Sequence, residues 1–196
     1  MTETRRRGRP GLDLATVLER SVELFIEQGF DGTSMDDLAR HLGISKSAIY
    51  HHVASKDALL GLALDLALSG LEEAAFEVRA AQVSPGARLE LLARRSVNVL
   101  VERLPYVTLL LRVHGNSEIE RAALVRRRQI DRLAAGLVQE AVASGELRAD
   151  ADPGVTARLL FGMVNSVSEW LRPGNALSAQ ALGDAVVALA FDGLRA

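Results

Sequence analysis

Residues 33–56, TSMDDLARHLGISKSAIYHHVASK, constrain the fold more than any other stretch of the chain. The first half carries four apolar residues at the spacing i, i+3, i+4 and i+7: Met35, Leu38, Ala39 and Leu42. That spacing places them on one face of a two-turn helix, which another element must cover. Gly43 can adopt the left-handed conformation that ends the helix, and Ser45 can cap the next helix through its hydroxyl oxygen. The pattern is typical of a helix-turn-helix.

The second helix of this pair, predicted over residues 46–52, buries Ala48 and Ile49. It leaves hydrogen-bond donors and an aromatic ring exposed to solvent: Lys46, Ser47, Tyr50 and His51. Such groups suit phosphates and base edges in a major groove. At the start of the first helix, Thr33 or Ser34 is the cap, with Asp36 or Asp37 at the third helical position. The stretch therefore predicts DNA binding.

Charge is distributed unevenly along the chain. The net charge of −2 argues against a protein that coats nucleic acid through bulk electrostatics. The N-terminal ten residues nevertheless hold four arginines against one glutamate: Arg5, Arg6, Arg7 and Arg9. No apolar signal-peptide core follows this basic arm, so we expect a cytoplasmic protein. The absence of cysteine excludes disulfides, thiolate zinc sites and a cysteine nucleophile.

The rest of the chain also has helical punctuation and no strand-length alternation. Caps, prolines and apolar stripes predict helices over residues 14–28, 56–80, 85–103, 106–113, 117–145, 153–172 and 178–193. The helix from residue 56 is apolar on nearly every side but lacks the ~18 uninterrupted apolar residues of a membrane span. We predict an all-α protein of about nine helices, with a helix-turn-helix DNA-binding domain at residues 1–57. A second helical domain is predicted over residues 58–196.

The N-terminal quarter resembles the tetracycline-repressor (TetR) family. The resemblance rests on Phe25, Gly29-Phe30, Gly32-Thr33-Ser34-Met35, Leu38-Ala39, Leu42-Gly43-Ile44-Ser45, Ala48-Ile49-Tyr50-His51-His52 and Ser55-Lys56-Asp57-Ala58-Leu59-Leu60. It covers roughly residues 15–62, and the remainder matches in architecture alone. It implies a DNA surface made of Thr33, Ser34, Ser45, Lys46, Ser47, Tyr50, His51 and Lys56. It also implies that the arginine arm follows the DNA backbone or enters a minor groove.

The resemblance further implies a homodimer that binds a palindromic DNA operator and responds to a small-molecule effector, with residues 58–196 as the ligand-binding and dimerisation domain. In this family the last two helices of each subunit form a four-helix bundle. The residues implied at that interface are Leu159, Gly162, Ser166, Val167, Leu182, Val186 and Leu189. No cofactor, metal or membrane partner is expected, and repression is the family default.

The effector is predicted from three segments, residues 112–128, 161–166 and 169–174. They resemble the corresponding parts of regulators that sense acyl-CoA esters in fatty-acid or steroid catabolism. A largely aliphatic pocket with arginines for the phosphates would fit such a ligand. The predicted pocket residues are Arg112, Arg126, Met163, Asn165 and Trp170. Residues 126–128 could instead be a solvated helix face, and Met163 and Trp170 could be core or dimer packing. An alternative function is a multidrug- or antibiotic-sensing repressor of an efflux gene.

Three other classes of protein are disfavoured or left open. An enzyme lacks support, because no nucleophile–base pair, metal constellation or phosphate-binding glycine loop is present in the sequence. His51 and His52 point ~100° apart on a helix, so they do not form a metal site. A structural helical module would not need the exposed donors of the helix-turn-helix. A DNA-binding protein without an effector remains open.

Overall fold

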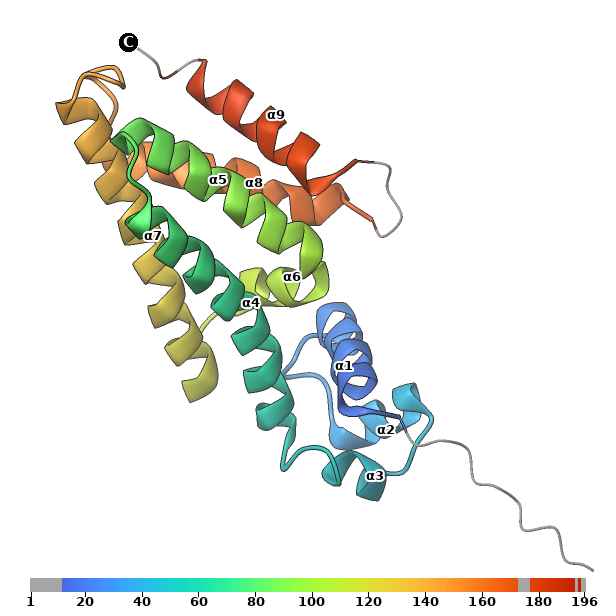
Figure 1. The fold of residues 1–196 in the computed structure, drawn as a ribbon. Helices are drawn as coiled ribbons and strands as arrows, with labels where there is room; N and C mark the ends of the chain where they lie inside the picture. The colour runs from blue at the N-terminus through green and yellow to red at the C-terminus, as the bar shows by residue number, and fades with distance from the viewer. Residues whose placement is uncertain (1–11, 173–176, 193, 195–196) are drawn as a thin grey trace, which may run out of the picture. The chain divides into compact units, whose positions relative to one another are not determined.

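The structure, a computed structural model, describes residues 12–172, 177–192 and 194. Within these residues it contains nine α-helices and no β-strand (Figure 1), so the predicted all-α fold is confirmed. The helices are α1 Leu14–Gln28, α2 Met35–Leu42, α3 Lys46–Tyr50, α4 Lys56–Ala80, α5 Pro85–Glu102, α6 Leu104–Arg112, α7 Glu118–Ala143, α8 Pro153–Trp170 and α9 Ala179–Phe191.

The chain forms two compact units. The N-terminal unit is Met1–Leu62 and the C-terminal unit is Ala63–Ala196, so the division falls inside α4. The predicted domain boundary, between residues 57 and 58, lies at the start of that helix. One continuous helix therefore carries residues of both units. No helix in the described residues is long and apolar enough to cross a lipid bilayer.

The N-terminal unit has a small core in which α1 packs on α2 and α2 packs on α3. Leu38 of α2 and Ile49 of α3 are fully buried. Phe25 of α1 meets Phe30 edge-on, with 5.1 Å between the ring centroids. The apolar face predicted for α2 is thus covered by α1, as an amphipathic helix requires.

Side-chain caps begin most of the helices, because the first N–H groups of a helix have no partner inside it. The caps are Asp13, Ser34, Ser45, Ser84, Ser117, Asp152 and Ser178. Of the two candidates for α2, Ser34 is the cap, and it forms a reciprocal capping box with Asp37. Gly43 ends α2 in the left-handed region, at φ 68°, as predicted. α3 is shorter than predicted and ends at Tyr50.

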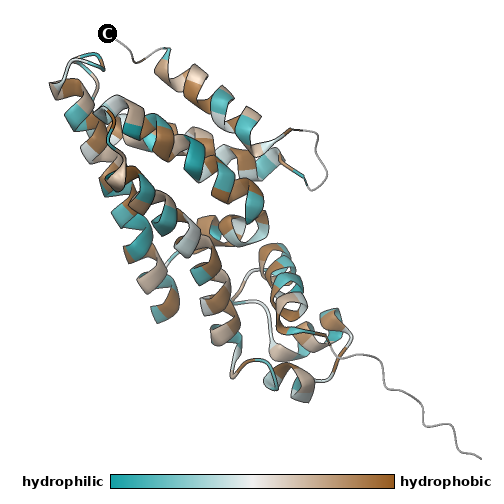
Figure 2. Ribbon diagram, in the orientation of Figure 1, coloured by the Kyte–Doolittle hydropathy of each residue, from teal (hydrophilic) through white to brown (hydrophobic). Residues whose placement is uncertain are grey.

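In the C-terminal unit α5 is the central helix and packs against α6, α7, α8 and α9. Its inner residues Leu89, Leu92, Ala93 and Val97 are fully buried. A Cβ atom at Gly183 of α9 would lie 3.4 Å from the Cα atom of Arg94, so α9 lies close against α5. Hydrophobic and hydrophilic residues occupy different sides of these helices (Figure 2), as expected around a shared core.

Candidate DNA-binding surface and ligand groove

The turn between α2 and α3 is held by hydrogen bonds within the N-terminal unit. The Ser45 hydroxyl accepts from the Ala48 amide at 3.1 Å. Arg20 of α1 donates to the carbonyl oxygens of His41 and Leu42 at the end of α2. Hydrogen bonds from the Ser34 hydroxyl and amide lower the pKa of Asp37 to about 2. The Asp37 carboxylate of the α2 capping box therefore stays charged across the physiological pH range.

The predicted DNA-contacting residues of α3 are exposed. Ser45, Lys46, Ser47 and His51 all face solvent, and the Tyr50 side chain is 51% exposed. The Lys46 ammonium lies 2.7 Å from a carboxylate oxygen of Asp36 on α2, so a phosphate would have to compete with that ion pair. The surface combines donors with an aromatic ring, which suits contacts to phosphates and base edges.

Two predicted phosphate-binding residues have internal partners in the structure. Thr33 is 2% exposed, and its hydroxyl donates to the Gly29 carbonyl at 2.7 Å. The Lys56 ammonium donates to the carbonyl oxygens of Phe30 and Thr33, both at 2.8 Å, and lies 4.2 Å from the Phe30 ring centroid. These contacts join the start of α4 to the α1–α2 connector. Arg5, Arg6, Arg7 and Arg9 lie outside the described residues.

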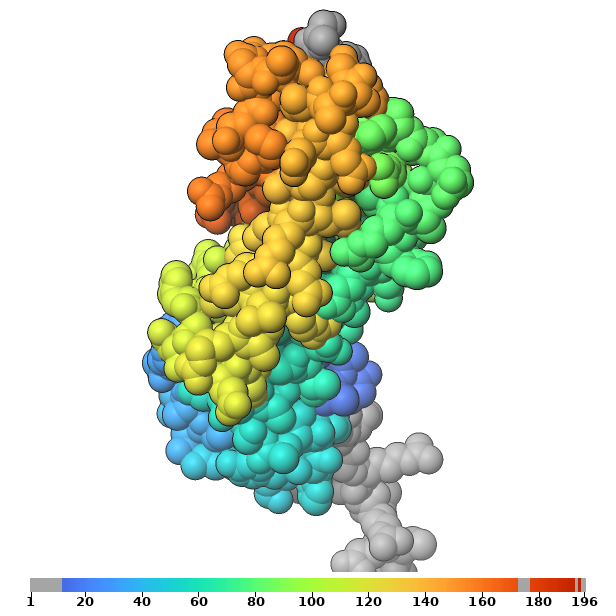
Figure 3. All heavy atoms as spheres, turned by 90° about the vertical axis from the view of Figure 1, so that its left-hand side faces the viewer, coloured from blue at the N-terminus to red at the C-terminus, as the bar shows by residue number. Residues whose placement is uncertain are grey.

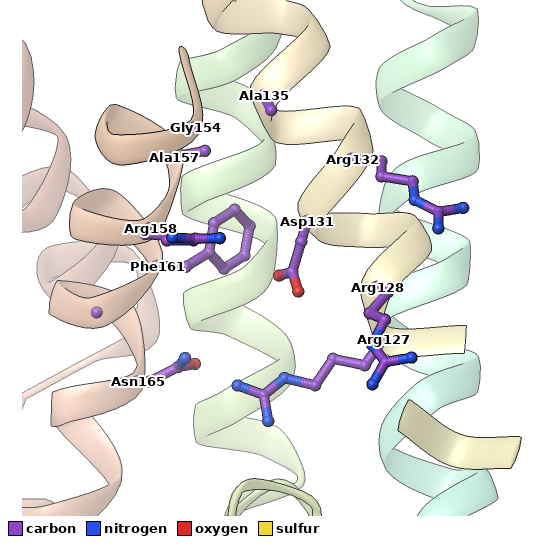
Figure 4. Close-up of a pocket in the computed structure, with 11 residues that line it drawn as sticks. Arg127, Arg128, Asp131, Arg132, Ala135, Gly154, Ala157, Arg158, Phe161 and Asn165 are labelled. Carbon is purple, nitrogen blue, oxygen red and sulfur yellow. The ribbon is translucent and has the colours of Figure 1, made fainter. Parts of the chain in front are cut away.

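A groove of about 560 Å³ lies between α7 and α8 in the C-terminal unit. We call it the basic groove; its lining comprises Arg127, Arg128, Asp131, Arg132, Ala135, Gly154, Ala157, Arg158, Phe161, Gly162 and Asn165. Figure 4 shows Arg158 and Phe161 of α8 facing Asp131 of α7, whereas Arg132 extends away from α8. α7 forms a continuous ridge on the face turned to the viewer in Figure 3.

The arginines of the basic groove are not neutralised by neighbouring carboxylates. Arg127, Arg128 and Arg158 form no hydrogen bond or ion pair with any residue that the structure describes. Asp131 is the single acidic residue in the described lining. The groove therefore carries excess positive charge and can bind an anion such as a phosphate.

A small cavity adjoins the basic groove inside the helical core. We call it the apolar cavity; it has a volume of about 30 Å³ and is lined by Leu71, Ser96, Leu100, Val107, Leu110, Leu111, Arg127, Ile130, Asp131, Phe161, Val164 and Asn165. Arg127, Asp131, Phe161 and Asn165 line both the groove and the cavity. We call these four residues the shared wall, because a ligand would extend past them from the basic groove into the apolar cavity.

Arg126 has a different environment from the next residues in the sequence. Its guanidinium donates to both carboxylate oxygens of Glu72 and to Asp65, with all three hydrogen bonds 2.7 Å long. Its hydrogen bonds lower the pKa of the Glu72 carboxyl. Both acidic residues lie on α4, so Arg126 ties α7 to α4 within the C-terminal unit and does not line the basic groove.

The other predicted pocket residues are spread over the C-terminal unit. Asn165 lines the groove and the cavity, as a ligand-binding residue would. Arg112 is exposed at the end of α6, and Trp170 is 48% exposed at the end of α8. Met163 lies in a separate, mostly apolar groove of about 380 Å³ with Thr156, Leu159, Leu160, Ala190 and Leu194. The structure therefore does not bring the five predicted residues together.

The residues predicted at the dimer interface fall into two groups. Leu159 and Leu189 are 66% and 77% exposed, and Gly162 and Ser166 also face solvent. Val167, Leu182 and Val186 are buried inside their own subunit, where α8 and α9 pack on α5. Apolar stripes on these helices supply both the core and an exposed face.

Most residues of the basic groove were not among the predicted pocket residues. Arg127, Arg128, Asp131 and Arg132 follow the spacing i, i+1, i+4 and i+5, which puts them on one side of α7. This helical spacing was a sequence signal that could have assigned these four residues to a side of α7 different from that of Arg126. The apposition of Arg158 and Phe161 with α7 depends on the packing of α8 and has no sequence signal. No group of three or more potential metal-ligating side chains occurs among the described residues.

A capped helix-turn-helix, joined by one helix to a helical unit with a charged groove, defines the class of protein. It is a DNA-binding regulator with a ligand-binding domain. A model of bacterial regulatory proteins of the tetR family matches residues 17–63, and a model described as tetracyclin repressor-like, C-terminal domain, matches residues 82–194. The chain belongs to the TetR family of bacterial transcriptional regulators.

Solved structures and curated relatives agree with this assignment. A TetR-family regulator from Streptomyces coelicolor A3 is 46% identical, covers 92% of this chain and 91% of its own, and gives a TM-score of 0.82. AibR, solved with isovaleryl coenzyme A and operator DNA, is 25% identical, with 91% and 97% covered and a TM-score of 0.74. The transcriptional repressor KstR2 of Mycolicibacterium smegmatis is 24% identical, with 91% of this chain and 88% of that protein covered.

Family membership establishes the general function. The chain is therefore a transcriptional regulator of this family, and the relatives named above include a repressor and a regulator solved with a small molecule and operator DNA. Both matched models belong to this one family of bacterial regulatory proteins.

Proposed function

We propose that this repressor binds a palindromic operator as a homodimer and is released when an acyl-CoA occupies the basic groove. The observation that supports this effector is that the basic groove adjoins the apolar cavity. Unpaired arginines line the groove, and the residues that line both sites separate these arginines from the aliphatic interior of the cavity. An acyl-CoA has the same division, with phosphates at one end and an acyl group at the other.

On the DNA side, Ser34, Ser45, Lys46 and Ser47 contact phosphates, and Tyr50 and His51 reach the major groove. The exposure of the α3 residues supports this assignment. Thr33 and Lys56 keep their internal hydrogen bonds and position the start of α4. The arginine arm adds sequence-independent attraction to the DNA backbone.

At the mouth of the basic groove, Arg127, Arg128 and Arg158 bind the phosphates of coenzyme A. Arginine suits this task because its planar group donates two parallel hydrogen bonds to phosphate oxygens. In AibR the bound ligand is isovaleryl coenzyme A, and that protein shares the fold of this chain. Asn165, at the shared wall, is placed to hydrogen-bond the amide or thioester part of the ligand.

The acyl group enters the apolar cavity, and the size of the cavity explains how binding changes conformation. Its volume of about 30 Å³ holds one or two water molecules, whereas ligand pockets span roughly 300–1,000 Å³. An acyl group must therefore displace the helices that line the cavity. Leu71 of α4 is one of the lining residues, and α4 continues into the helix-turn-helix unit. The ligand stabilises the displaced conformation and lowers the affinity for the operator.

The dimer interface consists of the exposed apolar face of α8 and α9. Leu159, Met163 and Leu189 form its apolar part, and Gly162 and Ser166 allow close approach of the partner helix. Val167, Leu182 and Val186 support this face from inside the subunit. Two-fold pairing presents two α3 helices to a palindromic site.

A multidrug-sensing repressor is the alternative, and the groove distinguishes the two functions. Cationic drugs would be repelled by the excess arginine in the basic groove, whereas acyl-CoAs would be attracted. A gel-shift assay with an operator selected from random DNA tests the choice. We expect acyl-CoAs to release the operator, and coenzyme A, free fatty acids and cationic drugs not to do so. Release by a cationic drug, with acyl-CoAs inactive, would refute the proposal.

A further inference from the structure

Ser96, at the middle of α5, has a buried hydroxyl without a partner. The residue is 2% exposed, and its Oγ atom forms no hydrogen bond with any residue that the structure describes. A buried hydroxyl that lacks a partner destabilises the folded state, because it loses its hydrogen bonds to water. Such a group in a native protein calls for an explanation.

Other buried helical serines in this protein have the ordinary partner, a carbonyl oxygen of their own helix. Ser21 donates to the Val17 carbonyl at 2.6 Å, and Ser168 donates to the Asn165 carbonyl at 2.7 Å. Ser96 lies in a regular helix where the same bond was available, yet its Oγ does not make it. The hydroxyl is therefore left for a partner from outside α5.

Ser96 lines the apolar cavity, where it is a chemical exception. Apart from Ser96 and the four residues of the shared wall, all lining residues that the structure describes are aliphatic: Leu71, Leu100, Val107, Leu110, Leu111, Ile130 and Val164. Ser96 lies on α5, whereas the shared wall belongs to α7 and α8, and Ser96 does not line the basic groove. It is thus on the side of the cavity that a ligand reaches after passing the wall.

On the basis of the proposed acyl-CoA effector, we propose that its acyl group carries a hydroxyl or keto oxygen beyond the thioester. Ser96 forms a hydrogen bond with that oxygen. The hydroxyl can donate to a keto oxygen or accept from an alcohol, so either oxygen satisfies it. The aliphatic residues pack around the rest of the acyl group. Asn165 and Arg127 serve the thioester and phosphate portions at the wall and in the groove.

This arrangement makes Ser96 a specificity-determining residue. A plain acyl chain in the cavity would leave the Ser96 hydroxyl buried against hydrocarbon, whereas an oxygenated chain pairs with it. Sites built around a hydrogen bond discriminate strongly against analogues that lack the matching group. The repressor would then respond to partly oxidised acyl-CoAs in preference to fully reduced ones.

Calorimetric titration of the full-length dimer with matched acyl-CoA pairs tests the inference. The probes are hexanoyl-CoA with its β-hydroxy and β-keto derivatives, and cyclohexanecarbonyl-CoA with its ring ketone. We expect at least one oxygenated probe to bind wild type roughly three- to tenfold more tightly than its parent. Ser96→Ala should remove that preference and leave the affinity of the parent unchanged. Ser168→Ala, which removes a buried serine with its own partner, should keep the preference.

The other outcomes separate this inference from the proposed function. Equal affinity within every pair, in wild type and in Ser96→Ala, would overturn the Ser96 assignment and leave acyl-CoA sensing intact. A uniform loss across both members of each pair would place Ser96 at the shared thioester and would also overturn it. Failure of every acyl-CoA to bind would refute the proposed function, and this inference with it.

Discussion

Arg126 donates two hydrogen bonds of 2.7 Å to the carboxylate of Glu72, one to each oxygen. Arg127 and Arg128, the next residues on α7, form no such bond with any residue in the described part of the chain. The three consecutive arginines therefore have different structural roles. Arg126 joins α7 to α4, and its neighbours supply charge to the basic groove.

The Arg126–Glu72 pair should make stability depend on pH in the acidic range. The hydrogen bonds of Arg126 lower the pKa of Glu72 below 4.5, so the folded protein favours the charged carboxylate. The pair's contribution is therefore fully present above pH 4.5 and is lost as pH falls through the lowered pKa. Glu72→Gln should reduce the Tm at pH 7 and have a smaller effect near pH 3. Equal reductions in Tm at both pH values would contradict this role.

Lys56 should stabilise the N-terminal unit rather than bind phosphate. Lys56→Met removes two hydrogen bonds to the carbonyls of Phe30 and Thr33, along with the contact to the Phe30 ring. Charge-assisted hydrogen bonds are each worth about 1.5–3 kcal/mol, and partial exposure reduces that value. We expect a loss of about 1–3 kcal/mol in the free energy of unfolding, measured by urea denaturation. Unchanged stability together with weaker DNA binding would identify Lys56 as a phosphate contact.

Lys46 and Tyr50 should show the opposite behaviour. Both side chains are exposed, so Lys46→Ala and Tyr50→Ala should leave the Tm and the dimer unchanged. Each should abolish sequence-specific operator binding in a gel-shift assay. In the remaining non-specific DNA binding, Lys46→Ala should also lower the slope of log affinity against log salt by about one, because one phosphate contact is lost. Wild-type affinity in both variants would refute the assignment of α3 as the DNA-contacting helix.

Leu189 should be essential for the dimer. The side chain is 77% exposed on α9, and Leu189→Glu would place a charge on the proposed interface. We expect monomers in analytical ultracentrifugation and loss of operator binding. Phe76→Glu is the matched control, because Phe76 is also exposed, at 73%, and lies on α4. A dimeric Leu189→Glu variant, or a monomeric Phe76→Glu variant, would place the interface elsewhere.

Local signals predicted the helices well. Ser84-Pro85, Asp152-Pro153 and Ser178 begin helices where the sequence placed them, because capping depends on residues a few positions apart. The exposed donors of α3 were predicted for the same reason. Such features need no knowledge of how distant segments pack.

The groove and the interface could not be predicted in the same way. The sequence does not show whether an apolar residue on α8 or α9 faces its own core or a partner, so Val186 and Leu189 looked alike. Lys56 has its partners in a connector more than twenty residues earlier, and its charge favoured a phosphate contact. Ser96 looked ordinary until the packing of α5 left its hydroxyl without a partner.

The central claim is that the arginines of the basic groove bind the phosphates of an acyl-CoA and thereby release DNA. It is tested most directly by fluorescence anisotropy of labelled operator, titrated with hexanoyl-CoA, in wild type, Arg158→Gln and Arg148→Gln. Arg148 pairs with Asp150, away from the groove, and controls for the loss of one positive charge. We expect Arg158→Gln to raise the concentration for half-release roughly tenfold or more and Arg148→Gln to leave it unchanged. Equal release of all three proteins, or no release of wild type, would contradict the claim.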